Sequence, residues 1–138
     1  MKTVVTLIFI ALFNGILYGQ LKNQDKIIEV YGQERVTQWM NDDPALITLL
    51  DNYISYGFMV KTVSEGKYSE FTPLESVPLS AKEGGAVSVA EFLEDFQSTN
   101  FNPLKYKFFP TNDFQVFKLK DVNRIIYILP QETILLKN

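Results

Sequence analysis

Six residues near the C-terminus, Arg124-Ile-Ile-Tyr-Ile-Leu129, are apolar on both sides of an extended chain. A strand with two apolar faces belongs in the middle of a sheet that is covered on both sides. The preceding residues alternate polar and apolar side chains, with turn residues between the runs. This pattern predicts a hairpin from residues 105–109 and 114–119. A turn over 120–123 then leads into a central strand over 124–129.

The first half of the chain has helical periodicity instead. Apolar residues recur on one stripe through residues 24–40, and Gly32 predicts a bend or break there, since glycine costs about 1 kcal/mol relative to alanine. Asp42-Asp43-Pro44 precedes a second apolar run that ends at Gly57. Proline suits the first helical position and aspartate caps free N–H groups, so we predict Asp43 as the cap and Asp42 as a turn residue.

A third helix is predicted from Ser88, because Ser88 and Glu91 have the spacing of a capping box. Between the helices, residues 58–63 predict a strand and residues 65–67 a turn. Residues 68–74 predict a second strand, which nearby prolines keep short or at an edge. The whole stretch 64–86 has no clear period and is the longest irregular segment. Such loops are functional or mobile.

These elements predict an α+β fold. An N-terminal helical hairpin and one further helix would pack on a small antiparallel sheet of about three to five strands, formed mainly by the C-terminal third. Pro130 predicts the start of a short terminal helix, which Ile134, Leu135 and Leu136 would dock on the sheet. A further strand is the alternative for this last segment.

Residues 1–19 have the order of a secretory signal peptide, with Lys2 near the start, an apolar run, and Gly19 before Gln20. The apolar run is shorter than the roughly 20 residues that span a bilayer, although a retained N-terminal anchor is the alternative. We expect residues 20–138 to form a single exported α+β domain with no integral membrane segment. The chain has no cysteine, so it carries no lipoprotein cysteine and no disulfide. These features indicate the periplasm or the exterior of a Gram-negative bacterium.

The charge is mildly acidic, with 13 basic and 16 acidic residues, and loss of residues 1–19 would remove only Lys2. Lys105, Lys107, Lys118 and Lys120 alternate with apolar residues, which is typical of strands with one wet face. Nucleic-acid affinity depends on clustered cations, so we do not expect a nucleic-acid partner.

The chain contains neither histidine nor cysteine, which excludes Ser-His-Asp and Cys-His centres in their usual form and the common ligands of zinc and copper. Asp42, Asp43 and Asp51 are the nearest approach to an acidic site. Asp51, however, lies about 12 Å further along the predicted helix. We therefore expect no catalytic residue, no cofactor and no metal site.

The function predicted from these features is non-enzymatic binding of another envelope protein. The irregular stretch supplies the candidate rim of a partner site or pocket, and an uncovered sheet edge is a second candidate surface. The rim residues are Tyr68, Phe71, Pro73, Leu74 and Pro78. A small-molecule or lipid carrier is the alternative, with an apolar pocket between helices and sheet. A carboxylate-dependent enzyme with two converging acids is a third.

Overall fold

The computed structural model describes residues 21–137, so the predicted signal peptide lies outside the described part of the chain. The helices in that part are α2 (Gln24–Tyr31), α3 (Gln33–Asp42), α4 (Pro44–Asn52), α5 (Val89–Phe96) and α6 (Gln131–Leu135). The strands are β1 (Phe58–Thr62), β2 (Ser76–Pro78), β3 (Ala86–Ser88), β4 (Gln115–Lys118) and β5 (Arg124–Ile128). None of the helices within residues 21–137 is long and apolar enough to cross a membrane.

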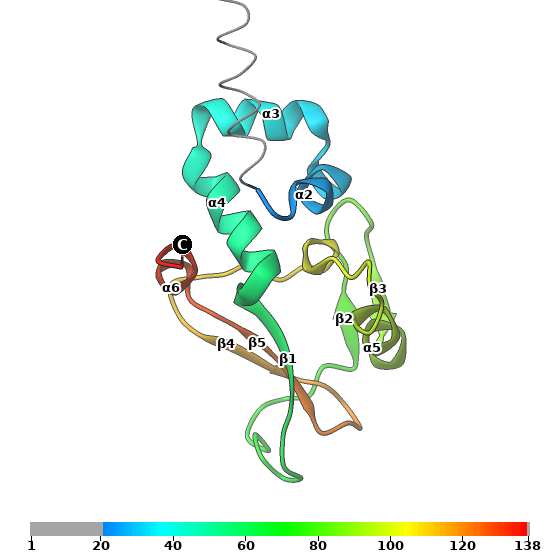
Figure 1. Cartoon of the computed structure of the whole chain (residues 1–138). Coiled ribbons are helices and arrows are strands. Elements are labelled where there is room, and N and C mark those ends of the chain that lie inside the picture. Colours follow the sequence, from blue (N-terminus) through cyan, green and yellow to red (C-terminus); the bar gives the residue numbers. More distant parts are fainter. Residues whose placement is uncertain (1–20, 138) are drawn as a thin grey trace, which may run out of the picture.

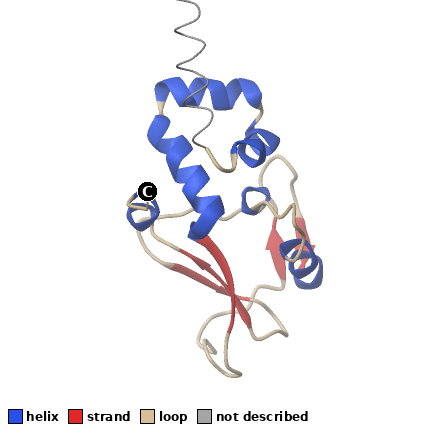
Figure 2. Cartoon of the chain, in the orientation of Figure 1, coloured by secondary structure: helices blue, strands red, loops and turns tan. Residues whose placement is uncertain are grey.

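The strands form two antiparallel sheets, and the predicted α+β class is confirmed. The larger sheet has the order β1-β5-β4, and the smaller one pairs β2 with β3. The predicted central position of the 124–129 strand is therefore confirmed, but the predicted cover on both faces is wrong, because Met59, Val116 and Tyr127 on its second face are half-buried and outside the core. Figures 1 and 2 show α2, α3 and α4 at one end of the molecule and the three-stranded sheet toward the other, with β2, β3 and α5 beside it.

The helix boundaries follow the local signals in the sequence. Gly32 separates α2 from α3 with φ of 86°, a left-handed value that glycine adopts without steric cost. Asp43 caps α4, because its carboxylate accepts a hydrogen bond from the Leu46 N–H at 3.1 Å. Ser88 and Glu91 form the predicted capping box at the start of α5. These three predictions are confirmed, although Asp42 is the last residue of α3 rather than a turn residue.

Gly57 ends a π-helical turn, Tyr53–Gly57, that follows α4 directly. Its role is to leave room rather than to adopt a left-handed conformation. A Cβ at this position would lie 2.7 Å from Ile134 Cδ1 and 3.1 Å from Tyr53 Cδ2. The missing side chain thus lets α6 pack against the junction of α4 and β1.

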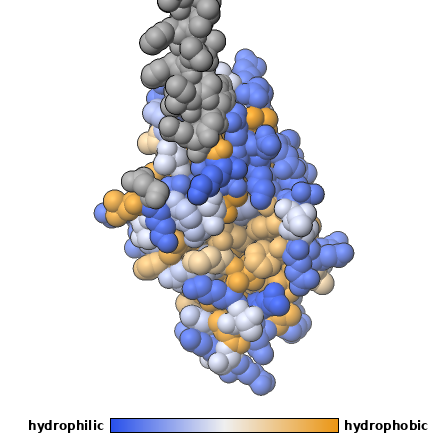
Figure 3. All heavy atoms as spheres, in the orientation of Figure 1, coloured by the Kyte–Doolittle hydropathy of each residue, from blue (hydrophilic) through white to orange (hydrophobic). Residues whose placement is uncertain are grey.

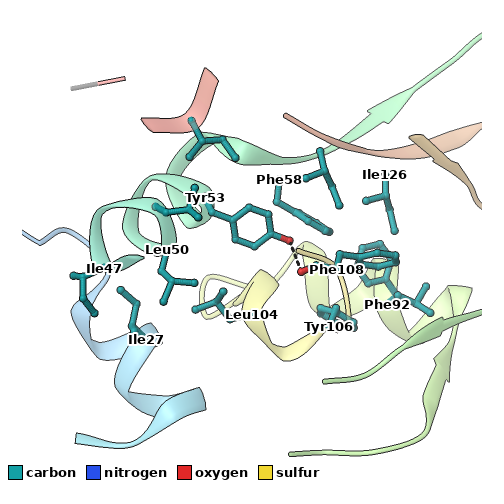
Figure 4. Packing of buried hydrophobic residues seen from close by; sticks show 14 of the residues in the cluster. Ile27, Ile47, Leu50, Tyr53, Phe58, Phe92, Leu104, Tyr106, Phe108 and Ile126 are labelled. Carbon is teal, nitrogen blue, oxygen red and sulfur yellow. Dashed lines mark hydrogen bonds between the residues drawn. The ribbon is translucent and has the colours of Figure 1, made fainter. Parts of the chain in front are cut away.

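The core lies between the inner face of the three-stranded sheet, the helices and the β2–β3 unit, and it is rich in aromatic rings. Phe58 is central, with ring centroids of Tyr53, Phe92 and Phe108 between 6.0 and 6.4 Å away. The Tyr53 hydroxyl donates to the Phe108 carbonyl at 3.2 Å, which satisfies a polar group inside this cluster. Figure 4 shows these side chains converging from the π-helical turn after α4, from β1, from α5 and from the segment around residue 108.

Two predicted strands are wrong. Residues 103–105 form a 3-10 turn, which the Asn102 side chain caps, and Tyr106 makes only an isolated bridge with Leu79. The segment pairs instead with residues 78–80. The Ser80 N–H donates to the Lys105 carbonyl, and the Lys107 N–H donates to the Pro78 carbonyl. Residues 65–70 are turns, and only Leu74 of the predicted 68–74 strand bridges another residue, Leu119.

The terminal helix α6 forms as predicted, but it packs mainly on α4 and the π-helical turn rather than on the sheet, and only one of its three predicted anchors is buried. Ile134 is fully buried, whereas Leu135 and Leu136 are 38% and 74% exposed. Successive side chains at the end of this short helix point in different directions, so only Ile134 faces the core. Asn52 also holds this helix, since its amide donates to the Ile134 and Lys137 carbonyls.

Candidate functional site

The two faces of the three-stranded sheet have different environments. Side chains alternate along a strand, so Ile126 and Ile128 face the core while Ile125 and Tyr127 face the other way. In the register of the sheet, Met59 and Val116 flank Tyr127, and Lys61 and Lys118 flank Ile125. Unlike their inner-face neighbours, Met59, Val116 and Tyr127 do not pack in the hydrophobic core. We call this surface the outer face; it comprises Met59, Lys61, Phe114, Val116, Lys118, Ile125 and Tyr127.

Aromatic and aliphatic groups are accessible on the outer face. Phe114, directly before β4, is 58% exposed, and its ring lies 5.5 Å from the Tyr127 ring. Met59, Val116 and Tyr127 are half-buried, whereas Ile125 is buried in the row between two lysines. More generally, the side of the molecule drawn in Figure 3 has apolar side chains at the surface across its middle, while the end around α3 is mainly hydrophilic. Apolar groups that are accessible together at a protein surface are typical of an interaction surface.

The outer face also carries positive charge. The Lys61 ammonium lies 4.6 Å from the centre of the Tyr127 ring, which is a cation–π contact. The ion pairs among the described residues are Lys105–Glu29 and Lys120–Glu75, and they involve neither Lys61 nor Lys118. In a chain with excess acid, this face is therefore suited to an acidic and partly apolar surface.

The edges of the sheet differ in their availability. The outer edge of β4 is partly covered, because the Leu74 N–H donates to the Lys118 carbonyl and the Lys120 N–H to the Leu74 carbonyl. In the described part of the chain, β1 pairs only with β5. The opposite edge of β1 thus presents backbone groups beside the outer face, where an extended segment of another chain can add a strand.

Four of the five predicted rim residues lie in the segment that links these two edges. This segment leaves β1, passes the β4–β5 turn where Val63 bonds to Asn123, and reaches the side of β4 at Leu74. Tyr68 and Phe71 contact each other at 5.8 Å between ring centres. Pro73 borders a shallow depression of about 360 Å³ that Lys118 and Lys120 also line.

Pro78 does not join the other four rim residues. It belongs to β2, and its carbonyl accepts a hydrogen bond from the Lys107 N–H at 2.8 Å. The five predicted residues therefore do not line one pocket. Tyr68, Phe71, Pro73 and Leu74 flank the end of the sheet, and Lys118 connects Pro73 to the outer face.

Sequence reasoning missed the outer face. The run 114–119 alternates, and Lys118 and Lys120 suggested that one side of this strand was simply wet. The same side also includes Phe114 and Val116, which is the signal that could have identified a mixed apolar and cationic surface. The contribution of Met59 and Lys61 could not be found in this way, since it depends on the pairing of β1 with β5.

The aspartates that looked most like a site in the sequence have separate structural positions. Asp51 is buried and accepts hydrogen bonds from the backbone N–H of Asn23 at 2.8 Å and from its side-chain amide at 3.1 Å. Asp43 caps α4, and Asp42 is exposed at the end of α3. Within residues 21–137, no group of three or more potential ligands among Asp, Glu, His and Cys is placed to hold a metal ion.

Comparison with known proteins gives no relative to guide the interpretation. No family model matches the chain, and no curated protein or solved structure matches it significantly. Function is therefore inferred from the chemistry of the surfaces themselves. The outer face and the open edge of β1 are the features that bear on the predicted binding role.

Proposed function

We propose that the protein is an exported, non-enzymatic binding protein that docks another envelope protein on its outer face. The observation that carries this proposal is the accessible group of Phe114, Val116 and Tyr127 beside two lysines that form no ion pair. Export is supported by the pattern of residues 1–19, and the lack of cysteine argues against a lipid anchor.

The chemistry of the outer face defines the partner. The partner binds through an extended segment. Apolar side chains of that segment cover Phe114 and Tyr127, and its acidic side chains reach Lys61 and Lys118. Main-chain hydrogen bonds to the free edge of β1 would align such a segment, and the side chains would provide selectivity. A lipid carrier with its ligand inside the fold is less well supported, because aromatic rings fill the space between α4, α5 and the sheet.

Site-specific photocrosslinking in the native envelope tests the proposal. A benzophenone amino acid replaces Phe114 in one strain and Leu136 in another. Leu136 is a matched control, since it is also an exposed apolar residue but lies outside the sheet. We expect one reproducible protein adduct from position 114 and none of that mass from position 136.

Charge-reversal substitutions in the strain with the crosslinker at position 114 test whether the adduct depends on the lysines of the outer face. The Lys61→Glu and Lys118→Glu pair should abolish the adduct from position 114, while Lys22→Glu, an exposed lysine next to α2, should leave it. Equal adducts from positions 114 and 136, or an adduct that survives the double charge reversal, would refute docking on the outer face. Circular dichroism of each purified variant checks that the fold is intact.

A further inference from the structure

A second surface, remote in sequence from β1 and β5, is hollow. It lies between the corner of α2 and α3 and the loop that joins β2 to β3, which Figure 1 shows reaching up beside α2. Two hollows of about 660 and 340 Å³ adjoin here and share Val30, Tyr31, Arg35 and Lys82 as lining residues. The smaller one also reaches the segment 104–109. We call the two together the α2–α3 groove.

One wall of the groove is apolar and held in place. Tyr31 packs edge-on against Trp39 with ring centres 5.0 Å apart, and burial raises the pKa of Tyr31, so its phenol stays neutral. Phe108 is anchored by its carbonyl bond to Tyr53 and by a ring contact with Phe117 at 4.8 Å. Phe109 is 42% exposed at the mouth. This wall is therefore preformed, which lowers the entropic cost of binding.

The charged residues of the groove are mainly cations. Arg35, Lys82 and Lys107 line it, and Glu34 is the acid among its lining residues. None of the three cations takes part in the two ion pairs between described residues. The Lys82 ammonium donates to the Glu29 carbonyl at 2.7 Å, which holds the β2–β3 loop against α2 and keeps this charge at the groove.

The β2–β3 loop adds Ser80 to the lining of the smaller hollow. Its hydroxyl oxygen is buried and has no hydrogen-bond partner within the described residues. Because this oxygen has almost no accessible surface, a molecule in the groove does not reach it. The cations and the aromatic wall, rather than this hydroxyl, therefore define what the groove can bind.

We infer that the α2–α3 groove binds a small amphiphilic anion. Its carboxylate, sulfonate or phosphate group lies among Arg35, Lys82 and Lys107, and its aromatic or aliphatic body lies against Tyr31, Phe108 and Phe109. A volume of this size is typical of small-molecule sites, which combine apolar walls with a few polar groups. This inference does not depend on the outer face, because the two surfaces share no residue.

Two fluorescent probes of nearly the same shape test the inference on residues 20–138. The first is 1-anilinonaphthalene-8-sulfonate, and the second is N-phenyl-1-naphthylamine, which lacks the sulfonate. We expect saturable binding of the sulfonate at one site. Arg35→Gln and Lys107→Gln should each weaken it about five- to tenfold, as expected for the loss of one charged contact at a partly exposed site. Binding of the uncharged probe should change less than about twofold.

Lys118→Gln is the matched control, because Lys118 lies on the outer face and outside the groove. It should leave sulfonate binding unchanged. The inference is overturned if the sulfonate does not saturate, if Arg35→Gln and Lys107→Gln have no effect, or if Lys118→Gln weakens binding as much. It is also overturned if both probes lose affinity equally, since the cations would then not recognise the anionic group.

Discussion

The aromatic interior beneath the sheet and the attachment of α2 represent two different ways to hold a fold together. In the interior, Phe92 is fully buried and contacts the Tyr106 ring at right angles, with centres 4.9 Å apart. The same region also includes Phe58, Phe101 and Phe108. At α2, by contrast, Ile27 is the one fully buried residue of the helix. Ile28, Val30 and Tyr31 are only partly buried against the core, and polar contacts from other segments add to the attachment.

These polar contacts surround α2 on several sides. Asp51 of α4 binds Asn23 just before the helix, and Asn102 donates to the Lys26 carbonyl at 2.9 Å. Glu29 pairs with Lys105 at 2.8 Å. The comparison of these two regions shows two separate contributions. Apolar packing supplies most of the stability, and directional hydrogen bonds fix the position of a helix that buries few side chains. The α2–α3 groove depends on the second kind of contact.

The largest effect is expected from a truncation in the aromatic interior. Ile126→Ala removes a fully buried side chain from the central strand and should reduce the free energy of unfolding by about 2–5 kcal/mol. Val116→Ala on the outer face is the control and should cost less than about 1 kcal/mol, because Val116 is half-buried and outside the core. Urea denaturation measures both, and equal losses would contradict the distinction between the two faces.

The next largest effect concerns the polar attachment of α2. Asp51→Ala leaves the backbone N–H of Asn23 without its acceptor, while the Asn23 side-chain amide keeps the Asp51 carbonyl and the Ser55 hydroxyl, and the change should cost about 1–3 kcal/mol. Hydrogen exchange should show faster exchange in α2 than in β5, since the contact holds the helix and not the sheet. Asp42→Ala is a control at an exposed aspartate and should stay within about 0.5 kcal/mol of the parent. Uniformly faster exchange would show that α2 and the sheet open together.

A substitution at the junction of the helices and the sheet tests packing without polar groups. Gly57→Ala places a Cβ 2.7 Å from Ile134 Cδ1, so α6 or the Ile134 side chain must shift. We expect a loss of about 1–2 kcal/mol, because the obstacle is the flexible end of a side chain. Ile134→Val removes that methyl group and should recover part of the loss in a double-mutant cycle. Strict additivity would show that the two residues do not interact as the geometry requires.

The smallest effect is expected at the exposed ion pair. The hydrogen bond from Lys105, and then that from Asn102, lower the pKa of Glu29. A lowered pKa in the folded state stabilises the protein above the unfolded-state pKa, and this contribution is lost as the pH falls through the folded-state value. Glu29→Gln should therefore cost less than about 1 kcal/mol at neutral pH, since the pair is 34% and 48% exposed.

The pH dependence separates this contact from packing. The stability difference between the parent and Glu29→Gln should shrink as the pH falls below the ordinary pKa of glutamate and through the lowered pKa of folded Glu29, where the carboxylate takes up a proton. The cost of Ile126→Ala should change little over the same range, because no titrating group is removed. Urea denaturation at several pH values measures both differences in the free energy of unfolding. A Glu29→Gln difference that stays constant with pH would contradict the prediction.

Much of the fold was predictable where a signal lies within a few residues. Asp43 caps a helix that begins at Pro44, the Ser88 and Glu91 box starts α5, and Gly32 divides α2 from α3. The double apolar face of β5 also predicted its central place correctly. The predicted strand over residues 105–109 is wrong, because an alternating pattern does not indicate which segment the strand pairs with. Their actual neighbours are residues 78–80, from a stretch with no period of its own.

The candidate sites were less predictable than the elements. The sequence by itself determined the α+β class, the helix caps and the lack of histidine and cysteine chemistry, because each depends on residue type or on local spacing. Only the tertiary structure decided that Lys61 and Lys118 flank Ile125, and that Arg35, Lys82 and Lys107 line one groove. Such surfaces join residues from distant segments, and the pairing and packing that bring them together leave no pattern in any single stretch of the chain.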